Sequence, residues 1–253
     1  MGFTVRKQKE LFERMWSDTA SLESGNLRVA ERQKTPIVKM LSSTPLPTEY
    51  GGFTYVVFGD LTNGQFHTMM IYGDASRIKK KERLLLRVHS ACGTSELFHA
   101  TNCECREELE EALKRISKAK SGIVIYLNQE GAGNGITAKT KAYSNAFEWK
   151  NGKIVERKKK DGSEVSIYDA YKKLGYPQEN RSFAAAAAML KEFGIRKVRL
   201  MTNNPKKVEG LKQYGIDVQP YGIHIKPKNN TMKRHLEAKA KLLGHSIKSK
   251  DLE

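Results

Sequence analysis

The stretch GGFTYVVFGDLTNGQFHTMMIYGD (51–74) decides how the fold begins. Apolar and polar residues alternate on both sides of Thr62-Asn63-Gly64, and Asn-Gly is a strong signal for a tight turn between two antiparallel strands. The segment RLLLRVHS (83–90) has the composition of a further strand. We therefore predict a region of β-hairpins at this end of the chain.

The pattern then changes to helices that alternate with strands. REELEEALKRISKAK (106–120) places Leu109, Leu113 and Ile116 on one helical face, and SGIVIYL (121–127) is typical of a short buried strand. Four later segments continue the alternation: a helix in 182–194, a strand in 197–202, a helix in 203–215 and a strand in 216–223. Hairpins followed by alternation predict an α+β or mixed α/β fold.

The chain divides into three parts on this interpretation. Residues 1–43 are expected to form a helical extension, because Leu11, Met15 and Trp16 recur at helical spacing. Residues 44–246 form one domain, opened by a Pro-containing connector, and 247–253 form a basic tail. Within the domain, 147–166 is expected to be a hairpin-like insertion that either reshapes a pocket or is an ordinary surface loop.

Composition restricts the classes of protein. No run approaches the ~18 apolar residues of a membrane span, and the N-terminal segment lacks a secretory pattern. Three cysteines, an odd number, argue against an exported disulfide scaffold. The sequence predicts a soluble cytoplasmic protein without a membrane partner.

The net charge of +17 indicates an anionic partner: nucleic acid, an anionic surface or a phosphorylated metabolite. Zinc-finger spacing, heptads after a basic region and an aromatic RNA-binding pattern are absent from the sequence. A solvated basic surface is the simpler interpretation, and nucleic acid is not the expected partner.

All three cysteines lie in HSACGTSELFHATNCEC (89–105). Cys92 is followed by the pair Cys103 and Cys105, just before the helix expected from Arg106, whose N-terminus favours thiolates. Three thiolates suit a catalytic zinc that keeps one position open. Buried free cysteines acting as small hydrophobes are the alternative, but the polar TNCECREE context disfavours it. His89 and His99 are possible additional ligands.

Several motifs occur in an order that resembles one enzyme family, GTP cyclohydrolase II, which opens riboflavin biosynthesis. They are RVHSAC (87–92), NCEC (102–105), YLNQEGAGNGITAKTKAY (126–143), LGYPQENRSF (174–183), VRLMTNNPKKVEGL (198–211) and HLEAKAKLLGH (235–245). The resemblance runs from about residue 45 to residue 246 and implies a GTP cyclohydrolase II-like fold.

The resemblance also implies an activity: zinc-dependent opening of the guanine imidazole ring of GTP at C8, with release of formate and, assisted by Mg²⁺, of pyrophosphate. It implies a homodimer that holds one zinc ion per chain on Cys92, Cys103 and Cys105. The general base falls on Glu179, the arginine proposed to attack the α-phosphate falls on Arg181, and a tyrosine near the purine falls on Tyr143.

The substrate-binding positions implied by the family are Arg87, Val88, His89, Ser90, Glu108, Glu130, Thr202 and Lys207. TNNPKK (202–207) follows a strand and opens a helix, so its backbone N–H groups can face a phosphate with Lys207 behind them. Each position has a simpler alternative: a helix cap for TNNPKK, a core aromatic for Tyr143 and a surface ion pair for Arg181.

The sequence departs from the family at recognition positions. Ala91 replaces a glutamate, Glu108 a glutamine, Ala132 an arginine and Ile167 a threonine, while Glu179 replaces an aspartate. Losing a donor to a buried acceptor costs about 2–5 kcal/mol. Two hypotheses follow: a GTP cyclohydrolase II with a drifted pocket, or an enzyme with the same zinc chemistry that opens another phosphorylated nucleoside or heterocycle, such as a pyrimidine. A third is a nucleic-acid-binding module on the same scaffold, which only the charge supports.

Overall fold

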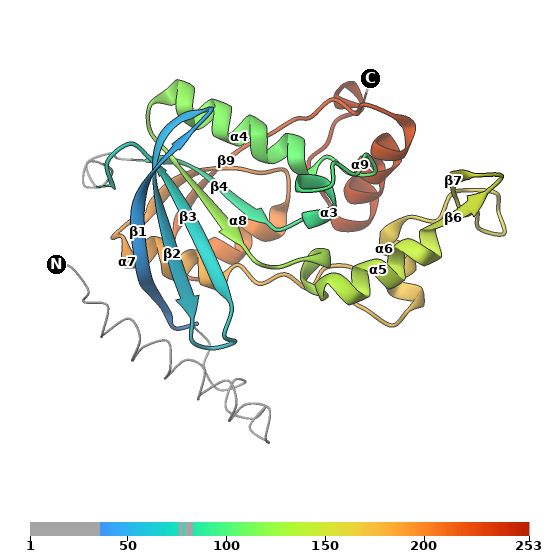
Figure 1. Cartoon of the computed structure of the whole chain (residues 1–253), viewed down its shortest axis with the longest axis horizontal. Helices are drawn as coiled ribbons and strands as arrows, with labels where there is room; N and C mark the ends of the chain where they lie inside the picture. Colours follow the sequence, from blue (N-terminus) through green and yellow to red (C-terminus); the bar gives the residue numbers. More distant parts are fainter. Residues whose placement is uncertain (1–35, 76–77, 79–82, 253) are drawn as a thin grey trace, which may run out of the picture.

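The protein is described by a computed structural model that covers residues 36–75, 78 and 83–252. Its centre is a seven-stranded mixed sheet with the strand order β1-β2-β3-β5-β4-β8-β9 (Figure 1). The strands are β1 Val38–Thr48, β2 Gly51–Asp60, β3 Phe66–Tyr72, β4 Leu84–Ser90, β5 Ile123–Leu127, β8 Lys197–Met201 and β9 Asp217–Tyr221.

The helices lie around this sheet and to one side of it. They are α3 Gly93–Glu96, α4 Cys105–Ala119, α5 Gly135–Ala146, α6 Ile167–Lys173, α7 Ala184–Glu192, α8 Pro205–Lys212 and α9 Asn230–Leu243, with 3-10 turns at Gly131–Gly133 and Ser249–Asp251. Within the described ranges, none of these helices is long and apolar enough to cross a membrane.

The sheet has two halves that differ in strand direction. Strands β1, β2, β3 and β5 pair antiparallel, whereas β5, β4, β8 and β9 pair parallel. Between β2 and β3, Gly64 adopts φ 70° and its N–H donates to Asp60 O at 2.8 Å, so the turn forms at the predicted Asn-Gly pair. The predicted mixed fold, with hairpins first and alternation later, is confirmed.

Helices cover both faces of the sheet. On one face, Met189 and Leu190 of α7 pack into the main apolar core with residues of β2, β3, β4, β5 and β8. On the other face, α4 inserts Ile116 beside Leu109 and Leu113, as the helical spacing predicts. Figure 1 shows α4 on the side of the sheet opposite α7 and α8.

The expected helical extension at 1–43 needs a correction. Residues 1–35 lie outside the described residues, but 38–43 are strand, because β1 begins at Val38 and pairs with β2. The segment interpreted as a Pro-containing connector continues the same strand through Pro45 and Pro47. β1 is an edge strand, and an edge strand tolerates proline because one side of its backbone has no neighbouring strand.

The predicted insertion forms a two-stranded hairpin, β6 Phe147–Lys150 with β7 Lys153–Glu156. Trp149 and Ile154 face each other across it and are exposed. The guanidinium of Arg234 on α9 forms an ion pair with Glu156, which fastens the hairpin to α9.

Candidate metal centre and its pocket

The three cysteines converge at one end of the parallel strands. Cys92 follows β4, while Cys103 and Cys105 lie at the start of α4. The three Sγ atoms lie within 4.8 Å of one another, and Cys92 Sγ and Cys103 Sγ are 3.7 Å apart. Zn–S bonds of ~2.3 Å in a tetrahedron place sulfur atoms about 3.8 Å apart. The cluster therefore has the donor type and spacing that fit zinc.

The charge around the cluster favours thiolate. Hydrogen bonds from the Cys103 and Cys105 thiols, and the nearby ammonium of Lys139, lower the pKa of the Cys92 thiol well below its usual range despite burial. Lys139 Nζ donates to Cys92 Sγ at 3.1 Å and to Glu130 Oε1 at 2.7 Å. The start of α4 at Cys105, with its helix dipole, acts in the same direction.

Glu104, which lies between Cys103 and Cys105 in the sequence, holds their loop in place through contacts with α9. Its side chain is fully buried, and its carboxylate pairs with the ammonium of Lys239 and lies 2.9 Å from His235 Nδ1. His235 also stacks on Tyr168, with ring centroids 5.7 Å apart. The loop that carries two thiols is thus held by α9 and α6, which are more than sixty residues away in the sequence.

A pocket of about 80 Å³ opens beside the cysteines. Besides the three thiols, it is lined by four predicted site residues: Ser90, Glu130, Tyr143 and Arg181. Sequence reasoning missed seven further lining residues: Gln129, Gly131, Lys139, Tyr168, Tyr171, His235 and Lys239. His235 and Lys239 are four residues apart on α9, so a helical reading of HLEAKAKLLGH could have placed both on one face.

Glu130 organises the loop that follows β5. Its Oε2 accepts from the backbone N–H of Gly93 at 2.7 Å, and its Oε1 accepts from Gly131 N–H and from Lys139, each at 2.7 Å. Two residues later, Ala132 adopts φ 56°, which is unusual for a residue other than glycine. In this structure Glu130 therefore ties three segments of the site together.

Tyr143 projects from α5 into the pocket. Its hydroxyl hydrogen-bonds with Thr94 Oγ1 at 3.3 Å, and Lys139 Nζ lies 5.6 Å from the centre of its ring. Burial raises the pKa of Tyr143 to about 12. The phenol thus stays protonated at neutral pH and can donate a hydrogen bond into the pocket.

Glu179 and Arg181 form a bidentate ion pair, in which Nε and Nη2 of Arg181 each donate to one oxygen of the Glu179 carboxylate. Burial raises the pKa of Glu179, but Arg181 more than offsets this and lowers it below its usual value. Arg181 lines the pocket, whereas Glu179 lies behind it and also accepts from Asn204 Nδ2 at 3.4 Å. Glu179 is therefore ionised and orients Arg181.

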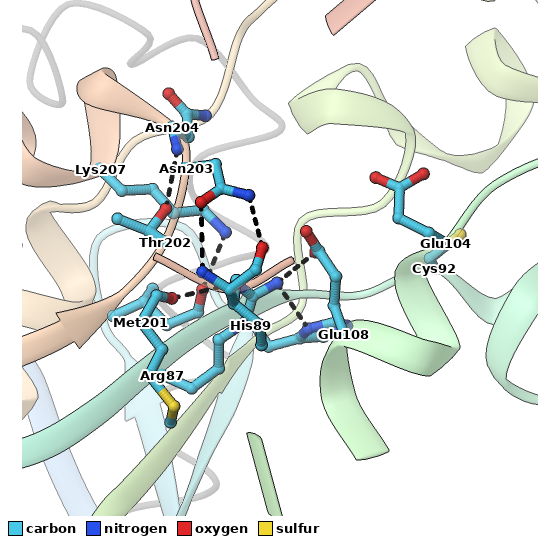
Figure 2. Close-up of polar contacts among 12 residues, drawn as sticks. Arg87, His89, Cys92, Glu104, Glu108, Met201, Thr202, Asn203, Asn204 and Lys207 are labelled. Atoms are coloured by element: carbon cyan, nitrogen blue, oxygen red, sulfur yellow. Dashed lines mark hydrogen bonds and ion pairs between the residues drawn. The ribbon is translucent and has the colours of Figure 1, made fainter. Parts of the chain in front are cut away.

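A second group of predicted residues is buried next to the pocket (Figure 2). Arg87 is 2% exposed; its Nη1 donates to Met201 O at 3.1 Å, and its Nη2 pairs with the Glu108 carboxylate. Burial raises the pKa of Glu108, but Arg87 and Lys239 lower it to about 2. The guanidinium predicted to meet phosphate is thus neutralised by a carboxylate of the same chain.

The same cluster contains the residues predicted from TNNPKK. Lys207 Nζ donates to Val88 O at 2.8 Å, and Thr202 Oγ1 accepts from the backbone N–H of Asn204 at 3.0 Å. Burial, together with the charges of Arg87 and Arg181, lowers the pKa of Lys207 well below its usual range. Thr202 lies just before α8 and Lys207 in its first turn, and Asn204 Oδ1 caps this helix by accepting from Lys206 N–H at 2.9 Å.

The two histidines considered as extra ligands lie apart from the thiols. His89 Nε2 is 2.9 Å from Glu96 Oε1, and its ring stacks on Tyr126. His99 is exposed in the loop after α3. In the part of the chain that the structure describes, the cluster with metal-ligating geometry consists of the three cysteines.

The family model for GTP cyclohydrolase II matches residues 39–222. "Riboflavin biosynthesis protein RibBA" of Parabacteroides distasonis is 37% identical over 221 residues, which cover 87% of this chain and 50% of that protein. The protein of the same name from Endomicrobium trichonymphae is 34% identical over 225 residues, 88% of this chain and 51% of the relative. This chain thus spans about half the length of these two relatives.

A relative of similar size gives a fuller match. "GTP cyclohydrolase-2" of Haemophilus influenzae (strain PittEE) is 35% identical over 210 residues, which cover 83% of this chain and 89% of that protein.

Proposed function

Because the chain belongs to the GTP cyclohydrolase II family, we propose that it is a zinc-dependent hydrolase that opens the imidazole ring of a guanine nucleotide. The observation that carries the proposal is the cluster of Cys92, Cys103 and Cys105 at a pocket that Tyr143 and Arg181 also line. A catalytic reading explains why polar, charged groups surround these thiols, which a packing role for cysteine does not.

Zinc held by three thiolates keeps one open position and supplies Lewis-acid activation of water near neutral pH. In the overall reaction two water molecules add in turn at C8, both C8–N bonds of the imidazole break with the ring nitrogens taking up protons to become amines, and C8 leaves as formate. Lys139 and Glu130 hold Cys92 and the loop beyond β5 in place, and the protonated Tyr143 can donate to a purine heteroatom.

Arg181 keeps its positive charge, since Glu179 raises its pKa further despite burial, and it faces the pocket where an α-phosphate would lie. While it is paired with Arg181, Glu179 has a lowered pKa and is a weak base. To act as the general base, its carboxylate must leave Arg181 and accept a hydrogen bond from the group that it deprotonates. We propose that Arg87, Thr202 and Lys207 serve the distal phosphates, with Mg²⁺ bound to the nucleotide.

Several wider features belong to the same proposal. They are a homodimer, a cytoplasmic location, a place in riboflavin biosynthesis, and a catalytic unit of 44–246 flanked by an extension and a basic tail. The family match at residues 39–222 supports this catalytic unit, and because β1 begins at Val38 the unit starts there rather than at residue 44.

One observation favours a different substrate for the same chemistry. At the position of the family's substrate-contacting glutamine, Glu108 pairs with Arg87, and at the position of its arginine stands Ala132. A substrate with several phosphates would meet fewer available cations than in the family. The second candidate is therefore a hydrolase that opens another phosphorylated nucleoside or heterocycle.

The test is an incubation of zinc-loaded protein with GTP and Mg²⁺, monitored by purine absorbance and formate. Cys103→Ser, which removes one thiol, is the matched control. Formate and a diaminopyrimidine from the wild type alone support GTP as substrate. Intact GTP in the presence of stoichiometric zinc directs the search to other phosphorylated heterocycles.

A further inference from the structure

A basic groove lies on the sheet at a distance from the cysteines. On the face that α4 covers, β4 and β8 place Leu85 beside Arg199, while Leu84 and Leu86 point into the main core on the other face. Tyr221 of β9 lies on the same face as Arg199. Together with the second half of α4, these residues line a groove of about 710 Å³.

The groove is strongly positive. We call it the basic groove and define it by Arg83, Lys114, Arg115, Lys118, Arg199 and Tyr221. Glu111 is the one acidic residue among its lining residues, and it pairs with Arg115 at 2.6 Å. Arg83 pairs with Asp217 at 2.7 Å. Counting described carboxylates, none lies within ion-pair distance of Lys114, Lys118 or Arg199.

An aromatic ring lies among these charges. The guanidinium of Arg199 is 4.4 Å from the centre of the Tyr221 ring, and that of Arg115 is 5.6 Å from it. Arg115 also donates to Gly222 O at 3.1 Å, which fixes its position. A guanidinium on a tyrosine ring offers a flat, cationic surface on which a nucleobase can stack. Lys114 and Lys118 of α4 line the same groove and can bind the phosphate groups of that nucleotide.

The basic groove is separate from the cysteine pocket. α4 begins at Cys105, which lines that pocket, and ends at Ala119, which lines the groove. At ~1.5 Å per residue, Cys105 and Lys118 are about 20 Å apart along the helix. The residues that line one cavity do not line the other.

The two sites use their charge differently. Lys139, Arg181 and Lys239 line the cysteine pocket, and each pairs with a carboxylate. Arg199, Lys114 and Lys118 are exposed and have no such partner among the described residues. The basic groove therefore presents positive charge that no described carboxylate neutralises.

We propose that the basic groove is a second binding site for nucleotide phosphates, either of a free nucleotide or of a unit in a single-stranded nucleic acid. A base stacks on the Arg199–Tyr221 pair, and its phosphates contact Lys114, Lys118 and Arg83. A groove of this size holds one nucleotide. Its open shape also lets a strand continue past it. The proposal does not depend on the activity at the cysteines.

The test uses the full-length, zinc-loaded protein and a fluorescent dodecauridylate RNA, titrated at several salt concentrations. We expect Lys114→Ala/Lys118→Ala to lower affinity at least tenfold and to reduce the slope of log K against log[salt] by roughly 1.4, for two phosphate contacts on a single strand. Lys172→Ala/Lys173→Ala, which removes the same charge from exposed positions on α6, is the matched control and should change little.

Two further measurements identify the ligand. Arg199→Lys keeps the charge and removes the flat guanidinium, so it should weaken RNA binding several-fold while leaving inorganic triphosphate binding unchanged. Competition by ATP identifies a free-nucleotide site, and RNA binding that resists ATP identifies a polynucleotide site. The proposal is overturned if neither RNA nor ATP binds at low salt, or if groove and control variants lose affinity equally, because the charge is then only a solvated surface.

Discussion

The cysteine pocket and the basic groove lie at the two ends of α4, and basic side chains line both of them. At and beside the pocket these side chains are buried in pairs with carboxylates: Lys139–Glu130, Arg181–Glu179, Lys239–Glu104 and Arg87–Glu108. In the groove the lysines of α4 face solvent. The difference shows that pairing, more than the number of charges, decides what a cationic surface does.

Because its charges are buried in ion pairs, the pocket should be sensitive to substitution of either member of a pair. Removing one member leaves an uncompensated charge in a low-dielectric interior, which is far more costly than losing a charge that water can solvate. The exposed cations of the groove contribute little to folding but remain free to bind anions.

Cys103→Ser should abolish both zinc retention and formate release, because Cys103 Sγ lies 3.7 Å from Cys92 Sγ in the cluster and a serine hydroxyl is a poor zinc ligand. Zinc content by mass spectrometry and formate release are the two readouts. Lys118→Ala in the groove should match the wild type in both. A Cys103→Ser protein that kept a full zinc ion and its activity would exclude this cluster as the metal centre.

Lys239→Met should lower the free energy of unfolding by about 3–5 kcal/mol, because it leaves the buried Glu104 carboxylate without its cation. Urea denaturation measures the change. The double variant Glu104→Gln/Lys239→Met should recover much of the loss, and Lys118→Met should stay within about 0.5 kcal/mol of the wild type. Equal losses for Lys239→Met and Lys118→Met would contradict the contrast between the two regions.

Acid should destabilise the protein by protonating Glu108, which is buried next to the pocket in an ion pair with Arg87. Glu108 titrates near 2 in the folded state, against about 4.3 when unfolded. Since the folded pKa is the lower one, the stabilisation by Arg87 is complete above the unfolded pKa and is lost as pH falls toward 2. Unfolding free energies measured from pH 6 to pH 2 should therefore fall less steeply in Glu108→Gln. An unchanged slope would show that this pair is not the source.

The smallest effect concerns recognition. Glu108→Gln restores the residue type of the family and removes the anion that neutralises Arg87, so KM for GTP should fall by about tenfold. Glu110→Gln, on the same helix but more exposed, is the control and should leave KM unchanged. A KM for GTP that rises in Glu108→Gln would indicate that the carboxylate contacts the substrate and that the substrate is not GTP.

Patterns local in the sequence were sufficient for much of the fold. The hairpin at Asn63-Gly64, the helical face of α4 and the alternation of later elements are fixed by neighbouring residues, and all three were predicted. β1 was missed because its prolines suggest a connector, and only its position at the sheet edge makes them acceptable.

In the site, too, features that depend on neighbouring residues were predictable and those that depend on distant residues were not. The clustering of the cysteines follows from their short spacing, but the ion pairs around them join residues up to 135 positions apart, as Lys239 and Glu104 do. No periodicity connects such residues. That Arg87 meets Glu108 rather than a phosphate depends on how α4 packs on β4, which only the three-dimensional structure displays.

The central claim is that the cysteine cluster, loaded with zinc, opens a guanine ring. The most direct measurement is ¹³C NMR of GTP labelled at C8, incubated with Mg²⁺ and protein of known zinc content. The account predicts labelled formate that accumulates over many turnovers and disappears in Cys103→Ser. Label that stays in intact GTP, with one zinc ion bound per chain, would contradict it.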